Sequence, residues 1–180
     1  MVYIDSFDSP IGRMTMAGDG EALIGLWFDG QKYDRALIKD CETEAAELPV
    51  FDLTKKWLGI YFNGEMPDFT PPFKLSGSPF RQLIGSIMLE IPYGSVMTYG
   101  EIAAVAAARM GRDRMSAQAV GGAVGHNPIS VIVPCHRVVG SDGSLTGYAG
   151  GVEKKVWLLR NEGIKPEGLG LYVPVKGTAL

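Results

Sequence analysis

Residues 129–138 of the chain read Ile-Ser-Val-Ile-Val-Pro-Cys-His-Arg-Val, and this stretch says most about the fold and the chemistry. The apolar run 129–133 predicts a buried strand. Proline cannot donate to a sheet ladder, so we expect the strand to end at Pro134 and to present Cys135 at its end. A neighbouring histidine lowers a thiol pKa from its usual ~8.5, so Cys135 beside His136 is typical of an activated nucleophile. The alternative, a buried cysteine beside a surface histidine, stays open at this point.

The composition limits the class of protein. The chain has 180 residues, 46% of them apolar, which is enough for one domain or two small ones with a hydrophobic core. No run has the apolar length that spans a bilayer, and the first residues lack the pattern of a secretory signal. Two cysteines, at 41 and 135, favour a reduced protein of the cytoplasm over a disulfide framework. With only two histidines besides, no zinc site or other metal is expected.

Charge divides the chain into two parts. Residues 1–73 carry 6 Lys and Arg against 13 Asp and Glu, a net charge of −7, whereas residues 74–165 carry 10 against 6, a net charge of +4. The overall charge of −3 therefore conceals a basic C-terminal part that contains Cys135. Such asymmetry indicates a polyanionic partner for that part.

The pattern of elements predicts an α/β fold, more closely α+β. A strand-rich N-terminal α/β domain is expected over 1–70, ending at the proline-rich connector 67–72. Its expected elements are strands at 2–8, 13–17 and 22–28 and helices at 32–47 and 51–63. A mainly helical domain follows over 74–165, and then a tail at 166–180. Its helices are expected at 79–89, 99–109 and 117–125, with N-caps at Ser78, Thr98 (in a capping box with Glu101) and Ser116.

The last two of these helices indicate a helix-turn-helix variant with a long loop. The helix 117–125 is unusual because it contains Gly121 and Gly122, and each internal glycine costs about 1 kcal/mol relative to alanine. Close approach of another backbone would compensate for that cost. The approaching backbone belongs either to a packed neighbouring element or to DNA, and the sequence leaves both open.

Four runs of the C-terminal part resemble the O6-alkylguanine-DNA alkyltransferase family. They are Ala-Val-Gly-Gly-Ala-Val-Gly-His-Asn-Pro at 119–128, Pro-Cys-His-Arg-Val-Val-Gly at 134–140, Gly-Tyr-Ala-Gly-Gly at 147–151 and Trp-Leu-Leu-Arg-Asn-Glu-Gly at 157–163. The resemblance covers roughly residues 78–165, while the N-terminal part matches only in its strand-turn-strand outline. It implies that 74–165 is a DNA-binding alkyltransferase domain and that 1–70 is a scaffold.

The resemblance implies direct reversal of DNA damage by a protein that reacts once. The damaged guanine is flipped out of the duplex, and the alkyl group on O6 moves irreversibly to Cys135. His136 resembles the base that deprotonates Cys135 through a water, and Glu162 the carboxylate that orients His136. Glu162 is also unusual by itself, because a carboxylate at a helix C-terminus faces an unfavourable dipole and calls for a specific partner. No cofactor is implied, and O4-alkylthymine is a further expected substrate.

The remaining site residues are carried over from the same resemblance. Asn127 looks like the residue that braces the active-site turn, and Tyr99 like the phenol that hydrogen-bonds and helps protonate the leaving guanine. The substrate pocket is implied for Tyr148, the Ala149 amide, Gly150 and Val138. The partner implied is double-stranded DNA, contacted in the minor groove without sequence preference by a monomer. DNA contacts are implied or expected for Ala117, Gln118, Ala119, Gly121, Arg109, Arg112, Arg114, Arg137 and Lys154.

Three other classes of protein fit parts of the pattern. A lesion-binding module that does not repair would not need Cys135, His136 and Glu162 together. A plain helix-turn-helix regulator needs neither the Cys-His pair nor Glu162. A cysteine hydrolase turns over, whereas alkylation of Cys135 would end activity after one reaction.

Gln118 stands where the family usually carries an arginine that fills the gap left by the flipped base. Glutamine brings no charge and a poorer stacking plane, so we expect weaker DNA affinity or slower flipping than with arginine. Gln118→Arg should therefore tighten binding to duplex DNA and speed the single-turnover reaction, as measured by fluorescence anisotropy and rapid quench. A variant that binds and reacts no better would contradict this expectation.

Overall fold

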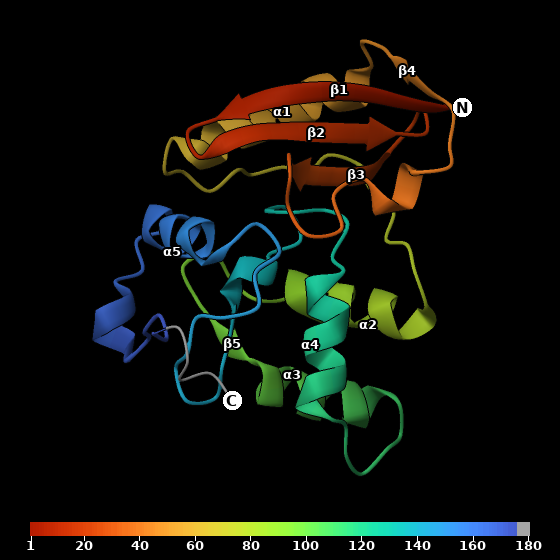
Figure 1. The fold of residues 1–180 in the computed structure, drawn as a ribbon. Coiled ribbons are helices and arrows are strands. Elements are labelled where there is room, and N and C mark those ends of the chain that lie inside the picture. Colours follow the sequence, from red (N-terminus) through yellow and green to blue (C-terminus); the bar gives the residue numbers. More distant parts are fainter. Residues whose placement is uncertain (176–180) are drawn as a thin grey trace. The chain divides into compact units, whose positions relative to one another are not determined.

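In the computed structural model, which describes residues 1–175, the chain forms two compact units (Figure 1). The first comprises Met1–Ser76 together with Pro128–Ile132, and the second comprises Gly77–Asn127 and the chain from Val133 onward. The last five residues of the expected tail at 166–180 lie outside the described residues. Within residues 1–175 no helix combines the length and the apolar character that crossing a membrane requires.

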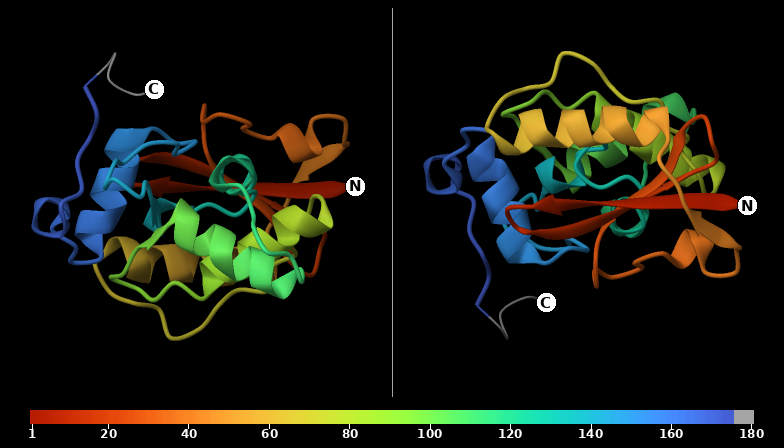
Figure 2. Two further views of the ribbon diagram at one scale, coloured as in Figure 1. Left: turned by 90° about the horizontal axis from the view of Figure 1, so that it is seen from below. Right: turned by 90° about the horizontal axis from the view of Figure 1, so that it is seen from above.

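The first unit is a four-stranded sheet with one helix. Its elements are β1 (Val2–Ser9), β2 (Gly12–Gly18), β3 (Leu23–Phe28), β4 (Thr43–Ala45) and α1 (Pro49–Phe62). The strand order is β3-β2-β1-β4, with antiparallel pairs except for β4, which runs parallel to β1. The buried residues of α1, among them Phe51, Leu58 and Tyr61, recur with helical spacing and so form one apolar face. Figure 2 shows α1 along one face of the sheet. The three predicted strands and the second predicted helix are confirmed.

The predicted helix at 32–47 is wrong. The segment contains only the short 3-10 helix η1 (Ala36–Ile38) and β4. Tyr33 and Arg35 have φ angles of 63° and 54°, in the left-handed region that interrupts a right-handed helix. Residues 43–45 instead pair with β1, because an edge of the sheet offers hydrogen-bond partners that the local sequence pattern does not reveal.

The second unit is mainly helical, as predicted. Its helices are α2 (Pro79–Leu89), α3 (Tyr99–Arg109), α4 (Ala117–Gly125) and α5 (Val152–Asn161), with η3 (Pro166–Leu169) after them. All three predicted N-caps are confirmed: the side chains of Ser78, Thr98 and Ser116 accept hydrogen bonds from backbone amides of the first turns. The short strands β5 (Met97–Thr98) and β6 (Val138–Val139) pair in parallel, so that β6 fixes the chain just after Cys135.

Residues 129–133 are buried, as expected, but they do not form the predicted strand. Only Ile129 forms a bridge, to Leu26 of β3. Val131 then has a φ of 70°, and the Ile132 amide donates to the Ser130 carbonyl across it, which is a strained γ-turn. Apolar periodicity reports burial, and it does not distinguish a buried strand from a buried turn.

A second tight turn leads directly into the nucleophile. Pro134 has φ −84° and ψ 64°, and the Cys135 amide donates to the Val133 carbonyl at 2.8 Å, which are the features of an inverse γ-turn. The 3-10 helix η2 (Cys135–Arg137) begins there. Pro134 therefore does end the apolar run and present Cys135, but through a turn rather than a strand end.

The capping box of α3 generates a stability prediction. Thr98 Oγ1 accepts from the Glu101 amide at 3.1 Å, and Glu101 Oε2 accepts from the Thr98 amide at 2.7 Å. Thr98→Ala should lower the free energy of unfolding by about 1 kcal/mol, because one helical amide loses its acceptor. Thr98→Ser keeps the hydroxyl and should lose much less. Equal losses in urea denaturation of the two variants would show that the hydroxyl does not act as the cap.

Candidate active site

Cys135 lies in the interior at the first position of η2, with only 6% of its surface exposed. Asn127 holds the turn before it, because its Nδ2 donates to the Val133 carbonyl at 2.8 Å. Burial raises the pKa of the Cys135 thiol, and a hydrogen bond with Asn127 opposes that effect without cancelling it. The nucleophile is therefore a neutral thiol in the resting protein, and it needs a base before it can react.

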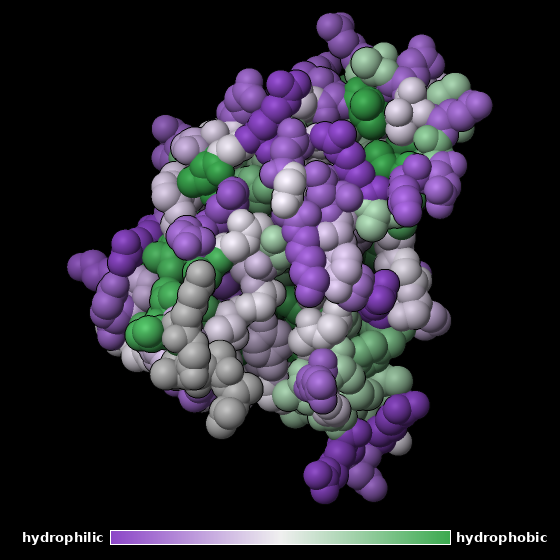
Figure 3. Space-filling model, in the orientation of Figure 1, coloured by the Kyte–Doolittle hydropathy of each residue, from purple (hydrophilic) through white to green (hydrophobic). Residues whose placement is uncertain are grey.

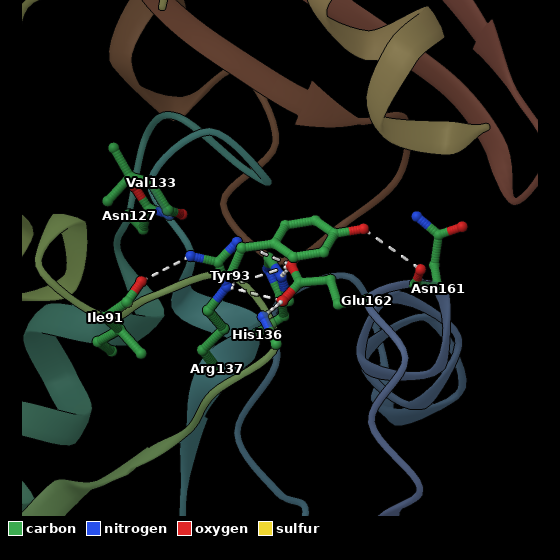
Figure 4. A network of polar contacts seen from close by, with 9 residues as sticks. Ile91, Tyr93, Asn127, Val133, His136, Arg137, Asn161 and Glu162 are labelled. Atoms are coloured by element: carbon green, nitrogen blue, oxygen red, sulfur yellow. Dashed lines mark hydrogen bonds and ion pairs between the residues drawn. The ribbon is translucent and has the colours of Figure 1, made fainter. Parts of the chain in front are cut away.

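His136 and Glu162 form a buried pair next to this thiol. His136 Nε2 lies 2.7 Å from Glu162 Oε1, and both side chains are inaccessible to solvent (Figure 4). Burial lowers the pKa of His136, and this effect exceeds the opposing effect of the Glu162 carboxylate. A neutral imidazole beside an ionised carboxylate carries its proton on Nε2, so Nδ1 is the nitrogen that can accept another proton.

Arg137 is the third member of this buried group, and its expected role as a phosphate contact is wrong. Its guanidinium donates to both oxygens of Glu162, at 2.9–3.2 Å, and to the Ile91 carbonyl at 2.7 Å. The residue is only 9% exposed and lies over the Tyr93 ring, 5.7 Å from its centroid. A buried carboxylate is stabilised by a buried cation. Arg137 provides that cation for Glu162, so its guanidinium is not available to contact a DNA phosphate.

These contacts fix the charge of Glu162. Burial raises its pKa, but the hydrogen bonds from His136 and Arg137 outweigh burial and bring the pKa to about 2. The Gly94 amide also donates to Glu162 Oε2 at 3.0 Å. Glu162 is therefore the partnered carboxylate that its position at the C-terminus of α5 had led us to expect.

Lys155 is the site residue that the sequence reasoning missed. It lies on the inner side of α5 with no exposed surface, and its Nζ donates to the carbonyls of Val138 (2.5 Å) and Thr146 (3.0 Å). Burial lowers its pKa to about 8, while its positive charge lowers the pKa of Cys135. The signal was present in the sequence: Lys155 occupies the same helical face as the apolar Leu158 and Leu159.

Two tyrosines complete the surroundings of the thiol. The Tyr99 hydroxyl donates to the Thr146 carbonyl at 3.3 Å, and burial raises the pKa of Tyr99 to about 12. Burial also raises the pKa of Tyr148 well above its ordinary value. Among the described residues the buried Tyr148 hydroxyl has no hydrogen-bond partner. Both phenols thus stay protonated and can donate to a ligand.

The remaining predicted pocket residues lie on the same unit. Ala149 and Gly150 are half-buried in the segment between Tyr148 and α5, and Val138 is buried in β6. Gly147, just before them, has a φ of 75°, and a Cβ there would lie 3.0 Å from the Tyr99 hydroxyl. This position therefore excludes a side chain, which keeps the segment close to Tyr99.

The predicted DNA-binding residues of α4 are on the surface. Ala117, Gln118 and Ala119 are exposed, and Gly121 is half-buried near the Tyr99 ring. A Cβ at Gly122 would meet no atom of the described chain within 4 Å, so packing against a neighbouring element, one of the two explanations for this glycine pair, is wrong for Gly122. The surface of the helix can therefore be approached closely from outside.

The basic residues predicted to contact phosphate differ in exposure and in pairing. Arg112 and Arg114 are exposed and line a groove of about 370 Å³ with the alanines of α3. Figure 3 shows hydrophilic side chains gathered at the α3–α4 loop beside a mildly hydrophobic surface. Arg109 is paired with Glu90 at 2.8 Å, and Lys154 is half-buried on α5. Arg112 and Arg114 are thus the best placed of the predicted phosphate contacts.

Two family models match nearly the whole chain. One describes the DNA-binding domain of 6-O-methylguanine DNA methyltransferase and matches residues 79–164, and the other describes the ribonuclease-like domain of the same proteins and matches residues 2–75. The chain belongs to this family. The resemblance stated from the sequence is confirmed, and with it the mixed fold with a strand-rich N-terminal sheet.

Relatives of similar length support the assignment. A methylated-DNA–protein-cysteine methyltransferase of Haemophilus influenzae is 40% identical over 164 residues, which cover 91% of this chain and 87% of the relative. The structure of Mycobacterium tuberculosis OGT in complex with DNA has 40% identity and a TM-score of 0.77, with coverage of 89% of this chain and 92% of that chain. An O6-methylguanine-DNA methyltransferase of the archaeon Pyrococcus kodakaraensis has 27% identity, a TM-score of 0.54 and coverage of 91% and 100%.

Acid should destabilise this methyltransferase-family protein through Glu162 and His136. Both have folded pKa values below their unfolded values of 4.5 and 6.5, so the unfolded chain binds more protons and stability is lost as the pH falls below 6.5 and then toward 2. Glu162 alone accounts for roughly 3 kcal/mol of this loss. Urea denaturation from pH 7 down to pH 2 measures it.

Glu162→Gln is the matched control for that experiment. At pH 7 it should cost about 3–5 kcal/mol, because Arg137 is left buried without its counter-ion. Its stability should then depend less on pH between 5 and 3 than that of the unsubstituted protein. An equal pH dependence in both proteins would place the acid-sensitive group elsewhere.

Proposed function

We propose that this protein repairs alkylated DNA by moving the alkyl group from O6 of guanine to Cys135. The observation that carries the proposal is the buried hydrogen bond between His136 and the ionised Glu162, with His136 next in sequence to the neutral Cys135 thiol and all three residues in one unit. A buried thiol with a base behind it is suited to attack on an alkyl carbon. The family assignment supplies the substrate class.

The reaction we propose is one displacement. His136 accepts the thiol proton at Nδ1 through a water, and Glu162 stabilises the imidazolium that forms. The Cys135 sulfur bonds to the alkyl carbon as the bond from that carbon to O6 breaks, and the electron pair stays on guanine. Tyr99, whose phenol is protonated, donates a proton to the guanine ring, which restores the ordinary base. The proton held by His136 then returns to Tyr99 through water, so that both side chains end neutral.

The substrate site we propose lies beside Cys135. Tyr148 supplies an aromatic wall and a hydroxyl that is available to a polar atom of the base. The Ala149 amide would donate to O6, and Gly150 and Val138 would border the alkyl group. Asn127 holds the turn through the Val133 carbonyl and so keeps the sulfur in place.

We propose that the flipped base comes from double-stranded DNA held by α4. The exposed small residues Ala117, Ala119 and Gly121 allow a close approach in the minor groove, with Gln118 beside the gap left by the base. Arg114 would contact phosphate, so binding should be independent of sequence and should weaken with salt. The protein would act as a monomer, without a cofactor, and would also accept O4-alkylthymine.

Intact-protein mass spectrometry tests the proposal. Mixing with duplex DNA that contains one O6-methylguanine should add the mass of one methyl group, and peptide mapping should place it on Cys135. The gain should saturate at one methyl per protein, because an alkylated sulfur cannot react again. The same assay with O4-methylthymine tests the second substrate.

Two cysteine variants are the controls. Cys135→Ser should gain no methyl group, whereas Cys41→Ser, which changes the exposed second cysteine, should react at the full rate. Unchanged protein mass together with measurable binding to the damaged duplex would instead make the protein a sensor of lesions. A methyl group on Cys41 would exclude Cys135 as the acceptor.

A further inference from the structure

We propose that Arg137 is a positioning residue that acts through Glu162. Its guanidinium holds the Glu162 carboxylate ionised and turned toward His136, and it thereby keeps His136 available as a base in mildly acidic solution. The activity measurement rests on the proposed function, but the titration of His136 does not.

The geometry of the contact supports this role. Arg137 Nε donates to Glu162 Oε2 at 2.9 Å and to Oε1 at 3.2 Å, while Nη2 donates to Oε1 at 2.9 Å (Figure 4). Two nitrogens of one planar group facing both oxygens fix the plane of the carboxylate. Oε1, which faces Arg137 Nη2, is also the oxygen that receives His136 Nε2.

Arg137 is itself held in place on its other side. Nη1 donates to the Ile91 carbonyl at 2.7 Å, and the guanidinium lies over the Tyr93 ring. Its side chain is 11% exposed, and that of Glu162 is inaccessible. An ion pair so removed from water is costly to break, so Arg137 acts as a fixed cation rather than as a mobile surface charge.

The charges around His136 show why this cation matters. Among the described residues, the titratable and charged groups around the Glu162–His136 pair include Cys135 and Arg137 from η2, Tyr93 from the segment after α2, and Lys155 from α5. The Arg137 cation contacts Glu162 directly. Without it, a proton from solution would bind more readily to the pair and leave His136 as an imidazolium, which cannot take the thiol proton.

The pH dependence of the single-turnover rate tests the proposal. In Arg137→Gln the acid limb of the profile should move to higher pH by about one unit or more, so that the rate at a pH within that limb falls about tenfold or more relative to its own plateau. Arg137→Lys keeps the positive charge without the planar fork, so its rate should fall while its acid limb stays close to that of the unsubstituted protein. If the single-turnover rate of Arg137→Gln falls by the same factor at every pH, Arg137 has only a structural role and the proposal is wrong.

NMR titration of His136 gives the same test without DNA. The imidazole pKa of His136 should rise in Arg137→Gln and stay nearly unchanged in Arg137→Lys, with His126, the second histidine, as the reference signal. In the Glu162→Gln background Arg137→Gln should change the His136 pKa much less, because the carboxylate through which Arg137 acts is then absent. A His136 pKa that Arg137→Gln leaves unchanged would overturn the proposal, even if alkyl transfer occurs.

A measurement on the unsubstituted protein covers the case in which Arg137→Gln does not fold. The carboxyl carbon signal of Glu162 should show an ionised group down to pH 4. Titration of Glu162 at or above the ordinary pKa of glutamate would contradict the proposal. If the unsubstituted protein transfers no alkyl group, the proposed function fails, and these two NMR measurements still decide the role of Arg137.

Discussion

The buried contact between Glu162 and Arg137 is the constraint on which the rest of the catalytic unit depends. Removing a carboxylate and a guanidinium from water is costly unless nearly every lone pair and proton has a partner. Here the partners come from two separate places: His136 in η2, and the segment after α2, which supplies the Ile91 carbonyl and the Gly94 amide. The end of α5, the turn at the thiol and the end of α2 must therefore meet in one arrangement, and that arrangement also orients the imidazole.

The path of the backbone into Cys135 is the second constraint. A γ-turn at Val131 with positive φ is unfavourable for a β-branched residue, and it persists only where the surroundings hold it. Residues 129–133 are buried, and two backbone hydrogen bonds flank Ile129: the Leu26 amide donates to the Pro128 carbonyl, and the Ser130 amide donates to the Leu26 carbonyl. The following turn at Pro134 needs no such support, since proline fixes φ. The relaxed turn at Pro134 leads directly into Cys135 and sets the direction in which η2 begins.

The sequence allowed the parts that depend on neighbours in the chain to be predicted. Caps such as Ser78 and Ser116 act within one helical turn, and the strands of the N-terminal meander are joined by short turns. The errors concern groups whose partners are distant in sequence. Arg137 was expected to contact DNA, since nothing near it in the sequence reveals its counter-ion, which lies 25 residues away. A helix was predicted at 32–47, since nothing near that segment reveals the pairing of β4 with β1. Lys155 was missed for the same reason, since carbonyls outside α5 receive its protons.

The charge state of the site fits a nucleophile that is used once. A thiolate is open to oxidants and to any electrophile, and a protein that cannot regenerate its sulfur loses its function with each such side reaction. Burial keeps Cys135 protonated, while Glu162 stays ionised and His136 neutral, so the base is ready before the thiol is reactive. The cation of Lys155 favours the thiolate but does not outweigh burial. The chemistry we propose therefore starts with proton transfer from Cys135 to His136, which the burial of both groups disfavours in the resting protein.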